Sequence, residues 1–381
     1  MKGFPYHYLD NSATTNVCRE AADKAAYMMT ECFGNPSSLH SLGFAAEREL
    51  SAARRAVAAL IGAEPETVTF TSGGTEANNL ALLGCAEAMS RRGRHIVTTA
   101  VEHSSVSEPL TVLEKQGFTV TRLTPGQNGL VSPGQVAAVC RPDTILVSIM
   151  LVNNETGARF PIEEIVPVVR RLSPIAKFHT DAVQAAGKLP IRLDKLGVDL
   201  LSLSGHKLHA PKGSGVLYRR SGCRLIPRLY GGGQEYGLRS GTEAVPAFAA
   251  LGAAVGALPD PAEFEAETKA LSDRLIAGLS RIPGVSLHRP ESAVPYIVSL
   301  SVPGLRSETL LHFLAQRDVY VSSGSACSKG RRSPVLTAMG MSADEIDSAL
   351  RVSLSRYNDE SDIDALLEGL SEATAALARR K

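Results

Sequence analysis

The stretch Ser202-Leu203-Ser204-Gly205-His206-Lys207 decides how this chain of 381 residues is organised. The apolar pattern over residues 198–203 predicts a strand that runs into a Ser-Gly-His-Lys turn. A second predicted strand, Lys177–Asp181, lies upstream and ends in a carboxylate, with Gln184 three residues beyond it. Open α/β sheets bind their ligands just past the carboxyl ends of their strands, so both segments mark a candidate site.

Lys207 and Asp181 together indicate a particular chemistry. An amine that can form a Schiff base and an aspartate that can pair with a pyridinium nitrogen are the protein's share of pyridoxal phosphate (PLP) chemistry. A lone lysine after a strand is usually a solvated surface residue. The interpretation therefore depends on the motifs that accompany it.

Three further polar clusters follow predicted strands. Ser72-Gly73-Gly74-Thr75 leads into a helix predicted over 77–91, and the first turn of such a helix suits a phosphate monoester because its N–H groups are free. The clusters at 102–106 and 153–157 follow predicted strands at His95–Thr99 and 144–152. One such cluster is typical of a capped helix start, whereas five at five strand ends favour a binding site.

The ordered motifs identify a family. The chain resembles the PLP-dependent cysteine desulfurases of the iron–sulfur-cluster and nitrogen-fixation type, in the class V aminotransferase group of PLP fold type I. The resemblance covers almost the whole chain. Its motifs are Tyr-Leu-Asp-Asn-Ser-Ala-Thr-Thr (8–15), Gly-Asn-Pro-Ser-Ser (34–38) with His40, Ser-Gly-Gly-Thr-Glu-Ala-Asn-Asn (72–79), the Ser-Gly-His-Lys turn, Gly-Gly-Gly-Gln-Glu (231–235), Arg-Ser-Gly-Thr (239–242), Ser-Ser-Gly-Ser-Ala-Cys (322–327) and Arg-Val-Ser-Leu (351–354).

The alternation of predicted strands and helices between about residues 66 and 220 favours an α/β fold with a mainly parallel sheet. The resemblance implies that this sheet has seven strands covered by helices in a large PLP-binding domain, residues 16–258. A smaller α+β domain would comprise residues 1–15 and 259–381. Pro259-Asp260-Pro261 is the strongest boundary signal. Helices are also predicted at 38–61, at 262–281, and at 362–380 with Ser361 as its cap.

The resemblance also implies roles for single residues. Lys207 would hold the cofactor through a Schiff base, and His103 would stack on the ring. Asp181 would pair with the pyridine nitrogen, while Gln184 and Asn154 would support the edge that carries the phenolic oxygen. The phosphate would be held by Gly74, Thr75, Ser204 and His206, joined by Thr242 from the other subunit of a homodimer.

The implied reaction converts L-cysteine to L-alanine. Arg351 would bind the substrate carboxylate in a planar fork, next to Asn154. Lys207 would move the Cα proton, and Cys327 would take the sulfur as a persulfide for an acceptor protein such as a cluster-assembly scaffold. The flanking small residues and the cations at 329, 331 and 332 favour a reactive thiolate at Cys327. The loop that follows Cys327 is shorter than the common pattern of the family.

Composition is consistent with an enzyme that acts on small molecules. The net charge is +1, with no basic block beyond Arg331 and Arg332, so no nucleic-acid or membrane binding is expected. No signal peptide and no apolar span is expected. The six cysteines contain no CxxC pair, which favours a reducing cytoplasm. His206 and His209 lack companion ligands, so no metal site is predicted.

Two other functions fit the same residues. One is a different enzyme on this fold, a selenocysteine lyase or a small aminotransferase, in which Cys327 is incidental. The other is a non-catalytic scaffold that holds sulfur for partner proteins. Loss of sulfur transfer in Cys327→Ala would separate the first of these from a desulfurase, and binding of the cofactor would argue against the second.

Overall fold

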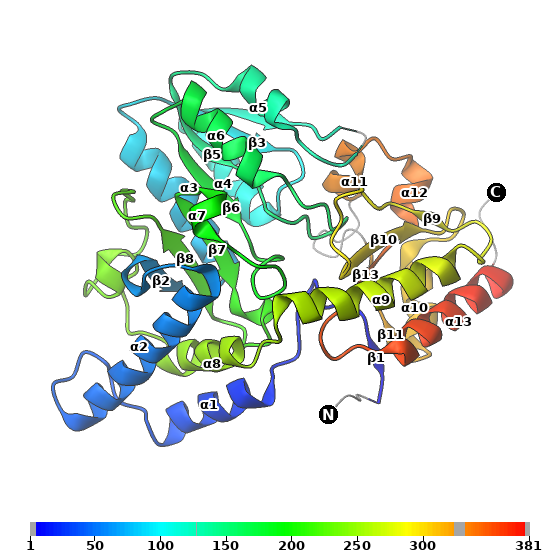
Figure 1. Ribbon diagram of the computed structural model, residues 1–381, viewed down its shortest axis with the longest axis horizontal. Coiled ribbons are helices and arrows are strands. Elements are labelled where there is room, and N and C mark those ends of the chain that lie inside the picture. The colour runs from blue at the N-terminus through cyan, green and yellow to red at the C-terminus, as the bar shows by residue number, and fades with distance from the viewer. Residues whose placement is uncertain (1–4, 127, 324–331, 378–381) are drawn as a thin grey trace.

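The computed structural model describes residues 5–126, 128–323 and 332–377. Within these residues the larger sheet has seven strands in the order β2-β8-β7-β6-β5-β3-β4 (Figure 1). In chain order they are β2 (Val68–Thr71), β3 (His95–Thr99), β4 (Thr119–Leu123), β5 (Thr144–Ser148), β6 (Lys177–Asp181), β7 (Leu200–Ser204) and β8 (Gly215–Arg219).

The sheet is mainly parallel, as the sequence predicted. The strands from β4 to β7 pair in parallel, and β8 runs antiparallel to both of its neighbours, β7 and β2. Since two antiparallel steps restore the direction, β2 runs the same way as β7. The carboxyl ends of β2, β3, β5, β6 and β7 therefore meet at one edge of the sheet, and these are the strands that precede the five polar clusters.

Helices cover both faces of the sheet. Neighbouring residues of β3 point to opposite faces, so Ile96 joins an apolar core with Leu80 and Leu110, whereas Val97 joins a separate core with Ile165. Strands buried on both faces read as continuous apolar runs, as β5 does. The helices between the strands are α3 (Gly74–Met89), α4 (Ser104–Lys115), α5 (Pro133–Val139), α6 (Ile162–Leu172) and α7 (Leu193–Leu196).

A second sheet forms from the C-terminal third of the chain. Its order is β12-β13-β10-β9, with antiparallel pairing, and β1 pairs in parallel with β11, which brings the N-terminal segment beside it (Figure 1). The strands are β1 (His7–Tyr8), β9 (Ser286–Leu287), β10 (Ile297–Ser301), β11 (Val319–Tyr320), β12 (Ser322–Ser323) and β13 (Ala349–Ser353). The helices here are α9 (Pro261–Leu279), α10 (Ser307–Ala315), α11 (Pro334–Ala338), α12 (Ala343–Asp347) and α13 (Glu360–Ala376).

Three more helices pack together beyond strand β2: α1 (Arg19–Thr30), α2 (Ser41–Ile61) and α8 (Val245–Gly256) (Figure 1). Short 3-10 turns occur at η1 (Pro65–Thr67), η2 (Gly205–Lys207) and η3 (Glu235–Gly237). Among the described residues, no single helix combines the length and apolarity that a membrane span requires; only α8 and α9 taken together, bent by 76° at their junction, meet that test.

Several predicted helix starts differ from the structure; α2, for example, begins at Ser41 and not at residue 38. Helix α13 is capped by Asp359 and not by Ser361, because the Asp359 carboxylate accepts the Ser361 N–H at 2.9 Å and forms a capping box with Asp362. Helix α3 begins at Gly74, three residues before the predicted start. Gly74 and Thr75 therefore lie inside its first turn, where backbone N–H groups lack intrahelical partners.

Candidate active site

Lys207 ends the short turn η2 and is buried. Its Nζ donates hydrogen bonds to the backbone oxygens of Ser12 and Ala13, the latter at 2.6 Å. The Thr15 N–H and hydroxyl both donate to the His206 carbonyl, at 3.0 and 2.9 Å. The N-terminal segment therefore lies across the turn that carries the predicted cofactor-binding lysine.

Asp181 ends strand β6, directly beside β7, with which it pairs at Ser202. Its carboxylate is buried and accepts hydrogen bonds from Asn78 Nδ2 at 2.7 Å and from the Val183 N–H at 2.9 Å. Gln184 donates from Nε2 to the Ser12 carbonyl at 3.0 Å, whereas its Oε1 is buried and has no hydrogen-bond partner among the described residues. A buried acceptor without a donor is a place where a ligand can supply one.

His103 caps the start of α4 with its own side chain. Its Nδ1 accepts from the Ser105 N–H at 3.1 Å and lies 2.8 Å from Ser105 Oγ. Burial lowers the pKa of His103; the charges of Lys207 and Arg351 lower it further, while Asp181 opposes them. Burial and the Lys207 charge also lower the pKa of His206, to about 4. Both rings are therefore neutral at pH 7.

The glycine turn before α3 lies against β7. Gly73 has φ +156°, and a Cβ added at Gly74 would stand 2.9 Å from Val183 Cγ2 and 3.5 Å from the Ser204 Cβ. A side chain at Gly74 would therefore force Val183 to shift. Thr75 is exposed in the same first turn, at the positive end of a helix of 16 residues.

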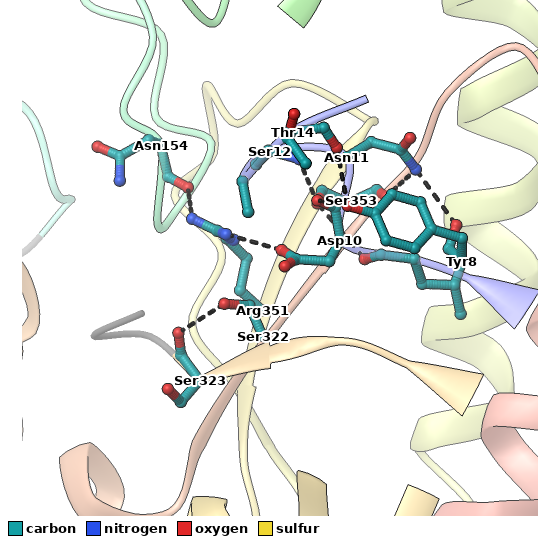
Figure 2. A network of polar contacts seen from close by, with 12 residues as sticks. Tyr8, Asp10, Asn11, Ser12, Thr14, Asn154, Ser322, Ser323, Arg351 and Ser353 are labelled. Atoms are coloured by element: carbon teal, nitrogen blue, oxygen red, sulfur yellow. Dashed lines mark hydrogen bonds and ion pairs between the residues drawn. The ribbon is translucent and has the colours of Figure 1, made fainter. Parts of the chain in front are cut away.

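Arg351 lies on β13 at the junction between the two sheets, with only 4% of its surface exposed. Figure 2 shows its guanidinium between Asn154 and Asp10: Nη1 donates to the Asn154 carbonyl and Nη2 to Asp10 Oδ1, each at 2.9 Å. Its Nε is buried without a partner within the described residues. Burial raises the pKa of Asp10, although the neighbouring Arg351 lowers it.

The contacts above do not include two of the predicted residues, Cys327 and Thr242. Cys327 lies in 324–331, outside the described residues. The last described residues before this segment form β12, where Ser322 pairs with Arg351 of β13. Strand β12 therefore lies next to the arginine that is predicted to bind the substrate. Thr242 is exposed in the loop before α8. The five cysteines that the structure does describe are free thiols: Cys18, Cys32, Cys85, Cys140 and Cys223.

Several residues at this edge were given no role from the sequence. Asn78 and Ser105 bond to Asp181 and His103, and Asp10 bonds to Arg351. Each stands inside a motif already singled out, and Asn78 follows Gly74 by one helical turn on the same face.

Lys188 carried no signal in the sequence: it is buried beside Tyr296, and burial lowers its pKa to about 8. Across the described residues, no cluster of three or more His, Cys, Asp or Glu suited to a metal occurs.

The chain is similar to known proteins over nearly its full length. The model of the family "Aminotransferase class-V" matches residues 7–366. The chain is 43% identical over 376 residues to a cysteine desulfurase IscS of Methanosarcina thermophila, covering 97% of this chain and 92% of that protein. It is also 43% identical over 365 residues to cysteine desulfurase 2 of Trichormus variabilis, covering 95% and 91%.

Solved structures give the same result. A NifS-like protein superposes with a TM-score of 0.93 at 36% identity, covering 98% of this chain and 100% of that one. A structure described as SspA in complex with cysteine gives 0.83 at 35% identity, covering 93% and 100%. The buried lysine and aspartate at adjacent strand ends are thus found in a chain that matches these proteins over nearly its full length. The chain belongs to the class-V aminotransferase family and, within it, to the cysteine desulfurases.

Proposed function

We propose that the chain converts L-cysteine to L-alanine with PLP and transfers the sulfur to Cys327 as a persulfide. The observation that carries this proposal is the pair Lys207 and Asp181, both buried, on neighbouring strand ends at the carboxyl edge of the sheet. The same edge carries His103 and Gln184, and the membership of the chain among the cysteine desulfurases supports the substrate.

The residues at this edge fit PLP. The buried Gln184 Oε1, which lacks a donor among the described residues, would accept from the ring substituents, and the Asp181 carboxylate would pair with the ring nitrogen. The crowded Gly74 turn leaves first-turn N–H groups for a phosphate, with Thr75, Ser204 and His206 beside them. Asn154 would approach the phenolic edge, and His103 would cover the ring face. When bound, PLP withdraws electrons from the substrate Cα.

Arg351 would bind the carboxylate of L-cysteine. Its guanidinium is already oriented by the Asn154 carbonyl and Asp10, and its free Nε adds a donor to the fork. A structure of one relative, SspA, is described as a complex with cysteine, which supports an amino-acid site of this kind. Lys207, once released, would move the Cα proton.

Cys327 would take the sulfur by nucleophilic attack. Its thiolate would attack Sγ of the substrate, so that an S–S bond forms and the Cβ–Sγ bond breaks. The electron pair of the broken bond stays with the substrate carbon, which takes up a proton to become the methyl group of alanine. The persulfide on Cys327 then passes its outer sulfur to an acceptor protein.

We also propose that two copies form a homodimer in which Thr242 reaches the phosphate of the partner's cofactor. Thr242 is exposed, and large apolar side chains are exposed over α1, α2 and the segment between them: Met29, Phe33, Leu39, Leu42 and Phe44. Exposed apolar groups gathered in this way are typical of a protein interface. The resemblance of the motifs to the iron–sulfur-cluster type of desulfurase favours a cluster-assembly scaffold as acceptor. The free thiols among the described residues favour the cytoplasm.

The test compares alanine and sulfide release from L-cysteine, with a reductant present, in wild type, Cys327→Ala and Lys207→Ala. We expect equal amounts of both products from wild type and at least a roughly 100-fold loss in each variant, because each removes a group that takes part in the chemistry. Cys140→Ala, which removes a partly exposed thiol elsewhere, is the matched control and should keep full activity.

Two results would contradict the proposal. Alanine release at the wild-type rate from Cys327→Ala would mean that Cys327 is not the nucleophile, and a different lyase or a transaminase would be the better assignment. Absence of product from wild type, together with no PLP absorbance after the cofactor is added, would favour a scaffold that holds sulfur without turnover.

A further inference from the structure

Two buried side chains without an assigned role, Asn78 and Ser105, connect Asp181 to His103. Asn78 Nδ2 donates to Asp181 Oδ2 at 2.7 Å and to Ser105 Oγ at 2.8 Å. Ser105 Oγ lies 2.8 Å from His103 Nδ1. Asn78 and Ser105 come from α3 and α4, so the packing of these helices at the sheet edge brings together the two residues proposed to contact the cofactor ring.

The direction of each hydrogen bond follows from the chemistry of its ends. A carboxylate only accepts, so the amide group that faces Asp181 must be the NH₂ of Asn78. That group has two hydrogens, and the second points to Ser105 Oγ. Ser105 Oγ can accept two hydrogens and donate one, so its role toward His103 Nδ1 is set by whichever group already donates to that nitrogen. The backbone N–H of Ser105 donates to the same nitrogen.

Because His103 Nδ1 accepts the Ser105 backbone N–H, it is unprotonated, and the Ser105 hydroxyl must then donate its hydrogen to the same nitrogen. A neutral imidazole carries one ring hydrogen, so that hydrogen resides on Nε2. If Nδ1 were protonated, its N–H would face the backbone N–H of Ser105, and two donors would meet without an acceptor between them. Of the charged groups that face the ring from the neighbouring elements, Lys207 and Arg351 disfavour the imidazolium and Asp181 favours it, and neutral His206 also faces it.

We propose that Ser105 and Asn78 are positioning residues that couple His103 to Asp181 and hold the ring hydrogen of His103 on Nε2. His103 is then a neutral hydrogen-bond donor with no free lone pair, so it does not act as the base, and movement of the Cα proton falls to Lys207. The kinetic part of this role rests on the proposed function, whereas the tautomer of His103 is a property of the protein that can be measured whatever it catalyses.

The experiment is ¹⁵N NMR of ring-labelled histidine in protein saturated with PLP. The chain has nine histidines, so His103→Gln assigns the signals of His103. In wild type we expect an unprotonated Nδ1 and a protonated Nε2. In Ser105→Ala, which removes the hydroxyl donor, the Nδ1 signal should move, the tautomers should mix, and the pKa of His103 should rise. Ser105→Thr restores a hydroxyl and should restore the wild-type signals.

Thr98→Val is the matched control, because it deletes a buried hydroxyl that has no hydrogen-bond partner within the described chain. It should leave the His103 signals unchanged. In kinetics, Ser105→Ala should lower kcat by about tenfold with little change in KM, less than the 10²–10⁴-fold loss of a general acid–base group. Its pH profile should change in parallel with the pKa of His103.

Two results would overturn the proposal: a hydrogen on Nδ1 in wild type, or His103 signals and titration in Ser105→Ala that match wild type. If Ser105→Ala does not fold, Ser105→Gly removes the same hydroxyl and keeps the backbone donor, and the wild-type spectrum remains decisive alone. Failure of wild type to form alanine would contradict the proposed function while leaving the tautomer result to stand or fall separately.

Discussion

At the scale of single residues, the orientation of Arg351 is fixed before substrate binds. The Asn154 carbonyl and the Asp10 carboxylate each accept a hydrogen bond from one terminal nitrogen, which fixes the orientation of the guanidinium plane. A flexible cation placed there would lose rotamer freedom on binding, whereas Arg351 has already lost it on folding. Substrate affinity is therefore expected to depend on the planar fork and not on positive charge alone.

Arg351→Lys tests this point. Lysine keeps the charge but offers a compact ammonium, so it cannot contact Asn154, Asp10 and a substrate carboxylate in the same geometry. A hydrogen bond to a charged group contributes about 1.5–3 kcal/mol, so KM for L-cysteine should rise by about 10–100-fold, with a smaller change in kcat. The measurement is steady-state alanine formation over a range of L-cysteine concentrations. An unchanged KM would show that Arg351 does not bind the carboxylate.

At the scale of elements, the buried carboxylate of Glu235 anchors the loop that carries Thr242 to helix α2 and strand β2. Glu235 accepts two hydrogen bonds from Arg54, at 2.8 and 2.6 Å, and a third from the Phe70 N–H of β2 at 2.8 Å. Glu235 and Tyr236 have φ values of 50° and 58°, a left-handed conformation that is costly for residues with side chains. The buried pair holds this strained turn in place.

The helices below strand β2 approach each other closely at a glycine. A Cβ added at Gly252 in α8 would stand 2.6 Å from the Ala53 Cα in α2. We therefore expect Gly252→Ala to destabilise the fold by about 1–3 kcal/mol through overpacking. Gly256→Ala, in the same helix with nothing within 4 Å, should be neutral or stabilising by up to about 1 kcal/mol. Urea unfolding of both variants makes the comparison, and equal stabilities would contradict the close approach.

Element bounds followed from the sequence where the pattern was continuous. Strands β3 and β6 occur at the predicted residues, because each is an uninterrupted and mostly buried run. The cap of α13 was missed because Asp359, Ser361 and Asp362 all suit a helix start, and only the geometry shows that the Asp359 carboxylate accepts the Ser361 N–H. The antiparallel insertion of β8 between β7 and β2 has no local signal at all.

At the scale of the whole molecule, the sequence predicted which segments meet at one edge of the sheet, because strand ends are visible as polar clusters after apolar runs. What it could not give from pattern alone is the contact of Arg351 with Asp10, 341 positions apart, or the Asn78–Ser105 connection between two helices. The first contact depends on the N-terminal segment lying beside β13, where Asp10 forms a bridge with Ser353, and the second depends on the packing of α3 against α4. The domain bounds at residues 15 and 258 and the role of Cys327 stay predictions.

Buried ionisable groups make the stability of the whole fold depend on pH. Burial raises the pKa of Glu102 to about 8, although the Thr99 hydroxyl and the Met150 N–H donate to its Oε1; its Oε2 has no partner in the described part of the chain. Burial also raises the pKa of Glu155 to about 7. Buried histidines act in the opposite sense, since burial lowers the pKa of His179 to about 3 and of His209 to about 4.

The sign of each effect sets the window for a measurement. A carboxyl whose pKa is raised on folding stabilises the fold at low pH, and this contribution is lost as pH rises through its folded pKa. A histidine whose pKa is lowered destabilises the fold only below its unfolded pKa of about 6.5. Between pH 6.5 and 8, therefore, the buried carboxyls change the free energy of unfolding and the buried histidines do not. The stability of the fold should fall as pH rises through this range.

Glu102→Gln should reduce the loss of stability that wild type shows between pH 6.5 and 8. The variant keeps an acceptor for Thr99 and Met150 but has no charge to bury. Since one pKa unit corresponds to about 1.4 kcal/mol, the free energy of unfolding of wild type should drop by about 2 kcal/mol more than that of Glu102→Gln between pH 6.5 and 8. Denaturant unfolding at several pH values measures this difference, with the exposed Glu368→Gln as control. Parallel pH curves for wild type and Glu102→Gln would mean that Glu102 is ionised in the folded protein throughout this range.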